Sequence, residues 1–524
     1  MSAAPRPGTA GPGERFWWRS LHDTARMIAD SGGGREGTVD EPPRVKAHRG
    51  RPRIPLPAPP RSLGGLRDGF PPAPRSGAAV PGAPRGLGRA RIAALGHYTC
   101  GLSRMELGPS ARWPYHRYTP SARCFFPTEF SCWTPGTDDL RAGTYAFDPA
   151  HHALVEVGAD DPSALSAALA TDLSCVSGVV VLASVFWRTA FRYGSYAYRL
   201  CAQEAGMVAG GLLMVSGTLG LRGRVHHGFD VPAVARILGV EPPDEAPMLA
   251  VVLGESVPRA AGAPAVFPVV DGPHPVSGRS GNDTPRIDPD RLGELVGIQR
   301  ADHGGDGPGH HRLPGVPGDA PVSGAPGPDL SATLRDRRSG GRAFVPEDRP
   351  LPDGALERVL AHALYTHPSD LVPEGSGPPV DVRVHARRIT GSRAGVYTWR
   401  GGVLESSAPA GGEGMDRAVP PANVDHRAAP CSVFLSVDRA LGQRVLGERA
   451  FRALNQEAGI VAQRVCVGAA AEGLAARVHN GYRARETAAA LGLGEGEEVL
   501  FQIILGRGRP TDTYEMDIVR GGEQ

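Results

Sequence analysis

The sequence lacks the marks of a secreted, metal-binding or membrane-spanning protein. Its seven cysteines are an odd number and form no CxxC pair, which indicates reduced, structural thiols and excludes a clustered zinc site. The N-terminus has no apolar signal region, and no apolar stretch reaches the roughly 18 residues that a membrane span needs. We therefore expect a cytoplasmic protein with no resident metal and no membrane anchor.

An excess of charge of one sign is also missing. There are 57 Lys and Arg against 55 Asp and Glu, for a net charge of +2. Nucleic-acid binding through bulk charge is therefore not expected. The basic stretch RVKAHRGRPR at 44–53 is either a solvated tail or a local basic arm.

Glycine and proline are abundant but unevenly placed. There are 71 glycines and 51 prolines, and they are dense in 50–92 and 272–328. These stretches bury too little apolar surface to fold alone and are expected to be loops or linkers. The length of 524 residues suits roughly two to four domains. We divide the chain into an N-terminal extension at 1–60, a first domain at 61–271, a linker at 272–327 and a second domain at 328–524.

An internal repeat relates the two domains. YRLCAQEAGMVAGGLLMVSGTLGLRGRVHHGFD matches FRALNQEAGIVAQRVCVGAAAEGLAARVHNGYR without a gap, so that Glu457 follows Glu204 by 253 residues and His479 follows His226 by the same number. Such a match over a long stretch predicts a duplicated unit.

Each repeat predicts the same order of elements. Its GTYAFD or GVYTWR segment has the alternation of a strand in a β-hairpin. Helical spacing of apolar and small residues then predicts a buried helix that ends at Gly220 or Gly473. A loop carrying His226 or His479, a short helix and an apolar strand ending at Gly254 or Gly506 follow.

Three segments of the first repeat carry a family resemblance. HRYTPSARCFFPTEFSCW, FWRTAFRYGSYAYRL and the QEAG helix resemble the SagB-type thiazole- and oxazole-forming dehydrogenases, which are nitroreductase-like flavoproteins. The resemblance covers roughly 90–260 and 328–510. It implies an α+β fold that dimerises with FMN at the interface. The tandem copies would then form an intramolecular pseudo-dimer, with a further homodimer left open.

The resemblance places the FMN phosphate on the second repeat. In LRDRRSGGRAF, Arg338, Ser339 and Arg342 match a segment that opens the first helix and reaches the phosphate and ribityl chain, although the spacing is one residue longer than in the family. Arg507 and Arg509 match late basic residues that close on the phosphate. Guanidinium groups suit a phosphate by charge and geometry. A solvated helix start and a charged strand end are the alternatives.

The first repeat matches the part that faces the flavin ring. Pro120 and Ser121 belong to a segment that reaches across the dimer, and Arg123 stands where the family has glycine. Arg192 and Tyr193 match a catalytic Lys-Tyr pair. Because arginine essentially never loses its proton, Tyr193 is the expected base or relay.

The second repeat lacks these features. It has Val445-Leu446 in place of Arg192-Tyr193, and the first repeat offers only PRSGAAV at 74–80 as a phosphate segment. One composite FMN site is therefore expected. Packing remains the alternative role for Arg192 and Tyr193. Glu204 and Glu457 occur in both repeats, which favours a structural role for them.

The expected activity is oxidation of thiazoline or oxazoline rings in a ribosomally made peptide, as in thiopeptide-like antibiotic biosynthesis. The implied partners are the azoline-containing precursor peptide and a cyclodehydratase of the YcaO type. Two alternatives stay open: an NAD(P)H-dependent nitro or flavin reductase, and a non-catalytic scaffold of a peptide-modifying complex.

Overall fold

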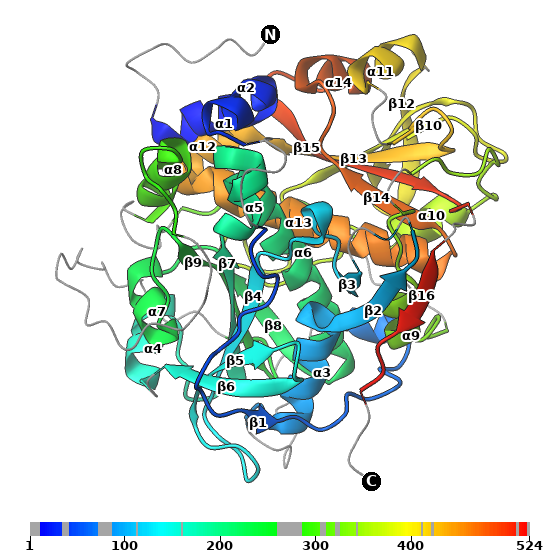
Figure 1. Cartoon of the computed structure of the whole chain (residues 1–524). Helices are drawn as coiled ribbons and strands as arrows, with labels where there is room; N and C mark the ends of the chain where they lie inside the picture. The colour runs from blue at the N-terminus through cyan, green and yellow to red at the C-terminus, as the bar shows by residue number, and fades with distance from the viewer. Residues whose placement is uncertain are drawn as a thin grey trace.

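Two antiparallel sheets stand on either side of a pair of long central helices (Figure 1). The computed structural model describes residues 11–33, 41–71, 86–109, 111, 114–158, 161–258, 286–303, 311–319, 325–341, 344–409, 412–420, 424–509 and 513–520.

The first domain has a seven-stranded sheet in the order β1-β6-β5-β4-β7-β9-β8. The strands are β1 Ile54–Pro55, β4 Thr128–Thr134, β5 Gly143–Asp148, β6 Ala153–Gly158, β7 Gly178–Val185, β8 Arg222–His226 and β9 Glu245–Gly254. The helices are α3 Arg89–Cys100, α4 Pro162–Leu169, α5 Trp187–Tyr193, α6 Ala197–Thr218 and α7 Val231–Leu238.

The second domain has a six-stranded sheet in the order β12-β11-β10-β13-β15-β14. The strands are β10 Asp381–Ala386, β11 Gly395–Arg400, β12 Val403–Pro409, β13 Cys431–Asp438, β14 Ala475–His479 and β15 Glu497–Gly506. The helices are α9 Leu330–Asp336, α10 Ala355–Leu360, α11 Gly412–Ala418, α12 Arg439–Leu446, α13 Ala450–Ala471 and α14 Ala484–Leu491.

The duplication is visible in the element boundaries. Helix α13, strand β14 and helix α14 begin and end 253 residues after α6, β8 and α7. The predicted GTYAFD and GVYTWR strands are β5 and β11, and the predicted apolar strands are β9 and β15. The predicted duplication into two tandem α+β units is thus confirmed.

One element of each repeat was predicted wrongly. The expected loop after the long helix is an edge strand, β8 or β14, and His226 and His479 end these strands. Five residues that include arginine give a weak strand signal, and pairing with β9 or β15 decides the conformation.

The two domains meet where α6 crosses α13. A Cβ on Gly206 would stand under 3.0 Å from the backbone of Gln456, and one on Gly459 equally close to the backbone of Gln203. Glycine thus lets the two backbones touch. Beside the crossing, the Gln203 amide donates to Asn455 Oδ1 at 3.0 Å and to the Leu500 carbonyl at 2.9 Å.

The continuous helical run Trp187–Thr218 is long and apolar enough to cross a membrane, with a mean hydropathy of 1.2. Its environment is nevertheless protein, because 94% of the apolar window is buried inside the molecule. The run therefore forms part of the core.

Segments outside the repeats are also structured. Helices α1 Pro12–His22 and α2 Thr24–Asp30 precede the first domain, and Phe16 and Trp17 pack edge-on against Phe451 at 5.0 and 5.1 Å. The stretch 44–53 is not a solvated tail, because Lys46 pairs with Glu245 and Arg53 with Asp148.

The expected linker at 272–327 contains helix α8, Gly293–His303, which is a correction. Leu295 and Ile298 are buried, and Asp302 pairs with Arg452 of α13 at 2.5 Å. Tertiary burial here outweighs the Gly- and Pro-rich composition of the surrounding chain. Likewise, α3 begins inside the expected loop 50–92.

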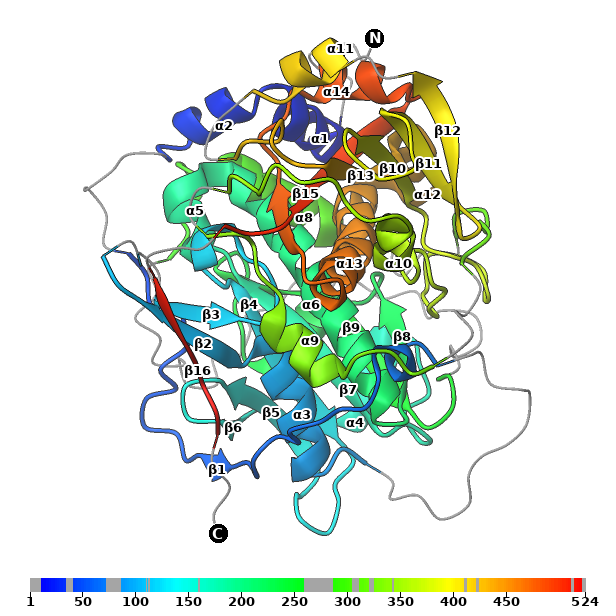
Figure 2. The same cartoon turned by 90° about the vertical axis from the view of Figure 1, so that its right-hand side faces the viewer.

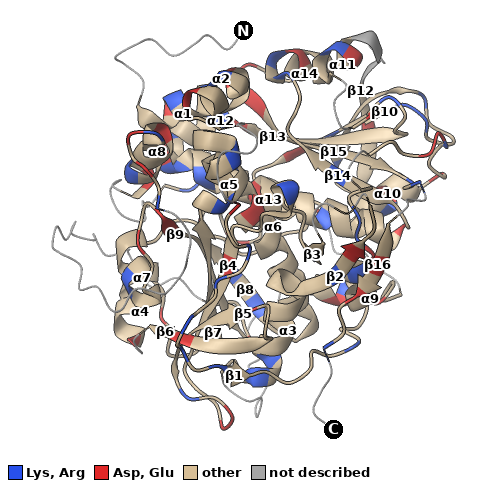
Figure 3. Ribbon diagram, in the orientation of Figure 1, with Lys and Arg blue, Asp and Glu red and all other residues tan. Residues whose placement is uncertain are grey.

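The C-terminal part of the second domain crosses to the first. Strand β16, Tyr514–Asp517, pairs with β2, Leu102–Leu107, which also pairs with β3, Tyr115–Arg117 (Figure 2). Basic and acidic residues lie side by side at β2 and β16 (Figure 3). This small sheet stands beside the helix crossing and forms one wall of the cavity described below.

Substitution at the helix crossing tests this packing. We expect Gly206→Ala to lower the free energy of unfolding by about 1–3 kcal/mol, because the added methyl overlaps the backbone of α13. Gly211→Ala on the same helix is the matched control: its nearest atoms would be 3.9 Å away, so it should be neutral or stabilising by about 0.5–1 kcal/mol. Denaturant unfolding monitored by circular dichroism gives both values, and equal destabilisation by the two substitutions would contradict the close crossing.

Candidate functional site

Two adjoining cavities lie between the domains. The first has a volume of about 730 Å³ and the second about 640 Å³, both in the range of cofactor sites. The two cavities share five lining residues from both domains, so they form one composite cavity. These are Pro120, Ser121, Arg123, Ser339 and Arg477.

Arginines crowd the first cavity. Those that line it are Arg104, Arg117, Arg123, Arg337, Arg338, Arg477 and Arg509. They outnumber the carboxylates of the same wall, which are Glu106, Asp336, Glu347 and Glu515. This end of the composite cavity therefore favours an anion.

Two of these arginines are held by neighbours in the cavity wall, and Arg337 joins the two domains there. Arg337 follows α9 and donates from Nε to the Tyr118 carbonyl at 2.7 Å, and it reaches the Ser339 hydroxyl at 3.2 Å. Arg338 pairs with Glu515 of β16 at 2.6 Å. Burial and the neighbouring Arg338 guanidinium lower the pKa of Arg104 to about 10, which reflects the density of positive charge.

The floor between the two cavities is a strained segment of the first domain. Arg123, Cys124 and Phe126 have φ angles of 50°, 55° and 49°, in the left-handed region that favours glycine. The Ser121 hydroxyl accepts from the Phe126 amide at 2.9 Å and braces the turn. Backbone strain of this kind gathers at ligand sites. The positive φ angle at Arg123 also explains why the family that the sequence resembles has glycine at this position.

The second cavity has an aromatic and apolar wall. Tyr193 and Tyr196 lie at the end of α5, and Leu200, Met207 and Phe501 complete the wall. Burial raises the pKa of Tyr193, while the nearby Arg123 guanidinium partly offsets this effect. Tyr193 is therefore a neutral phenol near pH 7. Thr24 and Ile28 of α2 also line this cavity, so the N-terminal extension contributes to its wall.

Glu204 of α6 lines the second cavity, although its presence in both repeats favoured a purely structural role. Its side chain is buried, and burial raises its pKa to about 7 against the opposing effects of Ser121 and Arg117. A carboxyl with this pKa exchanges protons near neutral pH.

The structure separates the predicted residues into those that line the composite cavity and those that do not. The former are Pro120, Ser121, Arg123, Tyr193, Arg338, Ser339 and Arg509. Arg192 and Arg507 line neither cavity, and Arg507 is exposed. Arg342 and the segment 74–80 lie outside the described residues.

The expected helix start at Arg338 is also corrected. Helix α9 ends at Asp336, so Arg338 and Ser339 follow a helix instead of opening one. Gly340 and Gly341, both with a φ of 76°, continue the chain in a conformation that a helix does not allow.

Arg477, Arg337, Arg104 and Glu204 were missed as site residues. Only Arg477 had a usable signal, because the repeat aligns it with Arg224 and marks both as arginines on corresponding strands.

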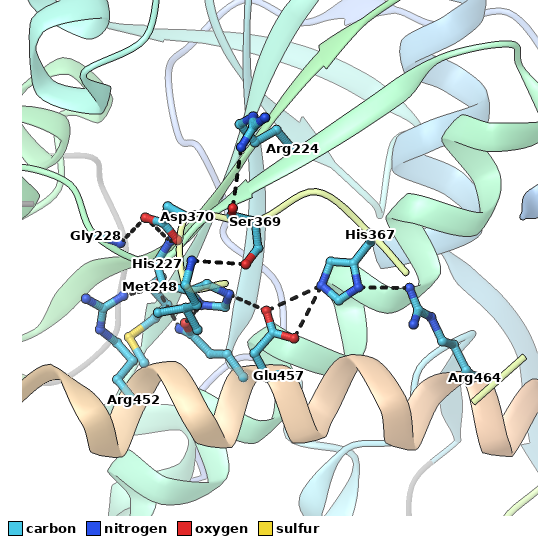
Figure 4. Close-up of polar contacts among 12 residues, drawn as sticks. Arg224, His227, Gly228, Met248, His367, Ser369, Asp370, Arg452, Glu457 and Arg464 are labelled. Atoms are coloured by element: carbon cyan, nitrogen blue, oxygen red, sulfur yellow. Dashed lines mark hydrogen bonds and ion pairs between the residues drawn. The ribbon is translucent and has the colours of Figure 1, made fainter. Parts of the chain in front are cut away.

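The repeat gives the second cavity a counterpart on the other side of α6 and α13. Protein fills this pseudo-equivalent position (Figure 4). Residues 367–374 run along β8, where the Val225 amide donates to the Pro368 carbonyl at 2.9 Å. Asp370 accepts from the amides of His227 and Gly228 at 2.8–3.1 Å. This segment occupies the space that corresponds to the open cavity.

The side chains there form a closed polar network. The Glu457 carboxylate lies 2.7 Å from His227 Nε2 and 3.3 Å from His367 Nε2, and Arg464 lies 3.2 Å from His367 Nδ1. The two histidines lower the pKa of Glu457 against its burial, whereas the Glu457 carboxylate raises the pKa of His227 against burial. The network is an ion pair that satisfies its own charge.

Comparison with known proteins agrees with this architecture. The sequence model of the nitroreductase family matches residues 334–507. No curated protein sequence matches the chain. A protein from Anabaena variabilis, whose structure is described as that of a nitroreductase, is 18% identical, with a TM-score of 0.68 over 95% of this chain and 100% of its own. The fold likeness therefore extends over both domains together.

Two further structures match over about a third of this chain. A nitroreductase structure from Ralstonia eutropha is 22% identical over 38% of this chain and 95% of its own, with a TM-score of 0.30. The microcin synthetase McbBCD complex of E. coli, with truncated pro-MccB17 bound, is 20% identical over 35% of this chain and 76% of its own, with a TM-score of 0.28. Residues 334–507 thus form a nitroreductase-family domain, within a chain whose two halves together have the nitroreductase-like fold.

Proposed function

We propose that this protein is an FMN-dependent oxidoreductase that binds one flavin in the composite cavity and oxidises azoline rings of a peptide. The observation that carries the proposal is the cavity itself, which is cationic at one end, aromatic at the other and walled by both domains. When bound, FMN would supply the hydride acceptor that oxidation of the ring requires.

The residues present fit FMN. Arg338, Arg477 and Arg509 would hold the phosphate at the cationic end. Ser121 and Ser339 stand where the two cavities join and would bind the ribityl chain. Thr119 also lines the first cavity, and its hydroxyl is buried without a hydrogen-bond partner, as expected of a group that awaits a polar ligand.

The aromatic end would receive the flavin ring and the substrate. Tyr193 is a neutral phenol there and would donate a hydrogen bond to the azoline or relay a proton. Arg192 lines neither cavity, but its charge lowers the pKa of Tyr193. It would therefore act as a positioning residue.

We prefer azoline oxidation to an NAD(P)H-dependent reductase and to a non-catalytic scaffold, for a separate reason in each case. The PSARCFFPTEF and RYGSYAYRL segments, which carry the resemblance to azoline dehydrogenases, supply cavity residues: Pro120, Ser121, Arg123, Tyr193 and Tyr196. An open cavity with titratable groups is not what a scaffold needs. The natural partner would be an azoline-containing precursor peptide, delivered with or without a cyclodehydratase of the YcaO type.

A substrate assay tests this function. The FMN-loaded protein should convert a thiazoline- or oxazoline-containing peptide to the aromatic azole under air, with loss of two hydrogens per ring measured by mass spectrometry. NAD(P)H mixed with the same protein should bleach the flavin absorbance slowly. Rapid bleaching by NAD(P)H with no azole formed would instead establish a nitro or flavin reductase.

Substitution of pseudo-equivalent arginines tests the cofactor site. Arg477→Gln should weaken FMN binding roughly 10- to 100-fold, because a charge-assisted hydrogen bond to the phosphate is lost. Arg224→Gln, 253 residues earlier, is the matched control and should leave FMN affinity unchanged, because Arg224 lies beside the filled position and donates to the Pro258 carbonyl. Fluorescence titration with FMN measures both, and equal losses would contradict the assignment.

A further inference from the structure

Two glutamates at the same repeat position have opposite environments. Glu204 projects from the middle of α6 and Glu457 from the middle of α13, 253 residues later. Both side chains are buried, with exposed fractions of 4% and 0%. Their positions are equivalent, so the surroundings alone determine what each carboxyl does.

Glu457 is neutralised by its neighbours. His227 comes from the opposite domain and His367 from the segment that fills this side, and both contact the carboxylate (Figure 4). Arg464 supports His367 from the next turns of α13. A carboxylate held in this way is a structural anion.

Neither histidine of this network has a histidine counterpart beside Glu204. The residue that corresponds to His227 is Asn480, whose side-chain amide lies 2.7 Å from Gln203 Oε1. The groups that hydrogen-bond Glu204 are instead Ser121 and Thr128. The residue that corresponds to Arg464 is Gly211. No ion pair joins Glu204 to a cation within the described part of the chain.

The charged and titratable groups around Glu204 come from several elements. Arg117 of β3 is the charged group that acts on it, and its guanidinium donates to the carbonyls of Thr128 and Arg44. Burial keeps the nearby Cys100 and Cys201 thiols protonated. The titratable and charged residues that share the cavity wall with Glu204 are Arg123, Tyr193, Tyr196, Arg477 and His479.

We propose that Glu204 is the catalytic proton acceptor of the composite cavity, left without the histidine contacts that hold Glu457 as a structural anion, so that its carboxylate can take a proton from the substrate. The proposal rests on the azoline oxidation proposed above. The ring α-carbon loses its proton to the Glu204 carboxylate, and that C–H electron pair becomes the second bond of the new C=C. The hydride on the β-carbon would leave with its electron pair to FMN, which would supply the two-electron acceptor, so that the ring loses two electrons and Glu204 ends protonated.

Glu204 suits this role better than Tyr193. The pKa of Glu204 is raised by burial to about 7, so close to half of it is ionised at neutral pH. The pKa of Tyr193 is raised above that of a free phenol, so Tyr193 holds its proton. Tyr193 then donates a hydrogen bond to the substrate while Glu204 accepts the proton.

The pH dependence of azoline oxidation tests the proposal. In the FMN-loaded protein, kcat/KM should rise about tenfold per pH unit below pH 7 and level off above it, because the carboxylate is the active form. Glu204→Gln should lower kcat roughly 100- to 10,000-fold and abolish this rising limb. Glu204→Asp should restore part of the rate and the limb. Tyr193→Phe should keep the limb at a lower rate.

The titration can also be followed without turnover. The infrared carbonyl band of a protonated carboxyl should disappear with a midpoint near pH 7 in the wild type and in Glu457→Gln, and should be absent in Glu204→Gln. Undiminished oxidation by Glu204→Gln, with the rising limb kept, would overturn the role of Glu204 and leave the proposed function standing. A wild type that titrates as described but oxidises no azoline would overturn the proposed function, and the proton-acceptor role with it.

Discussion

The close crossing of α6 and α13 is the constraint on which the rest of the structure depends. Gly206 and Gly459 let the two helix backbones touch, and this contact fixes the domains as a pseudo-symmetric pair. Once the pair is fixed, each domain presents its post-helix strand to the other, and two pseudo-equivalent spaces arise beside the helices. The cavity is thus a consequence of helix packing between repeats, and neither repeat forms it alone.

The two spaces have diverged in opposite directions. One space keeps the arginines, the strained segment at Arg123 and a carboxyl that no cation among the described residues neutralises. The other space is filled by residues 367–374 and by the His-Glu-His network around Glu457. A buried carboxylate without partners is costly, so the filled side gains stability by pairing its charge. On the open side Ser121 and Thr128 hydrogen-bond Glu204 without neutralising it, and its pKa stays raised, which is the pattern expected where a group serves chemistry instead of stability.

Much of this arrangement could be predicted from the sequence, because the constant spacing between the two repeats shows which residues correspond. The offset of 253 residues predicted the paired long helices and the short helices, and with one residue fewer it predicted the apolar strands. The complementary losses in the two repeats predicted a composite site. Helix α8 and strands β8 and β14 were missed because tertiary pairing, and not local composition, decides their conformation. Glu204 was missed for a related reason: its identity is shared with Glu457, and only the three-dimensional neighbours Asn480 and His227 distinguish the two.

The central claim is that two repeats build a single flavin site. The most direct measurement is the number of FMN molecules bound per chain, from the visible absorption spectrum of the purified protein after incubation with excess FMN and removal of the unbound cofactor. This account predicts one FMN per chain. Two per chain would show that the filled side also accepts a flavin, and none would show that the composite cavity is not a flavin site; either result would contradict the account.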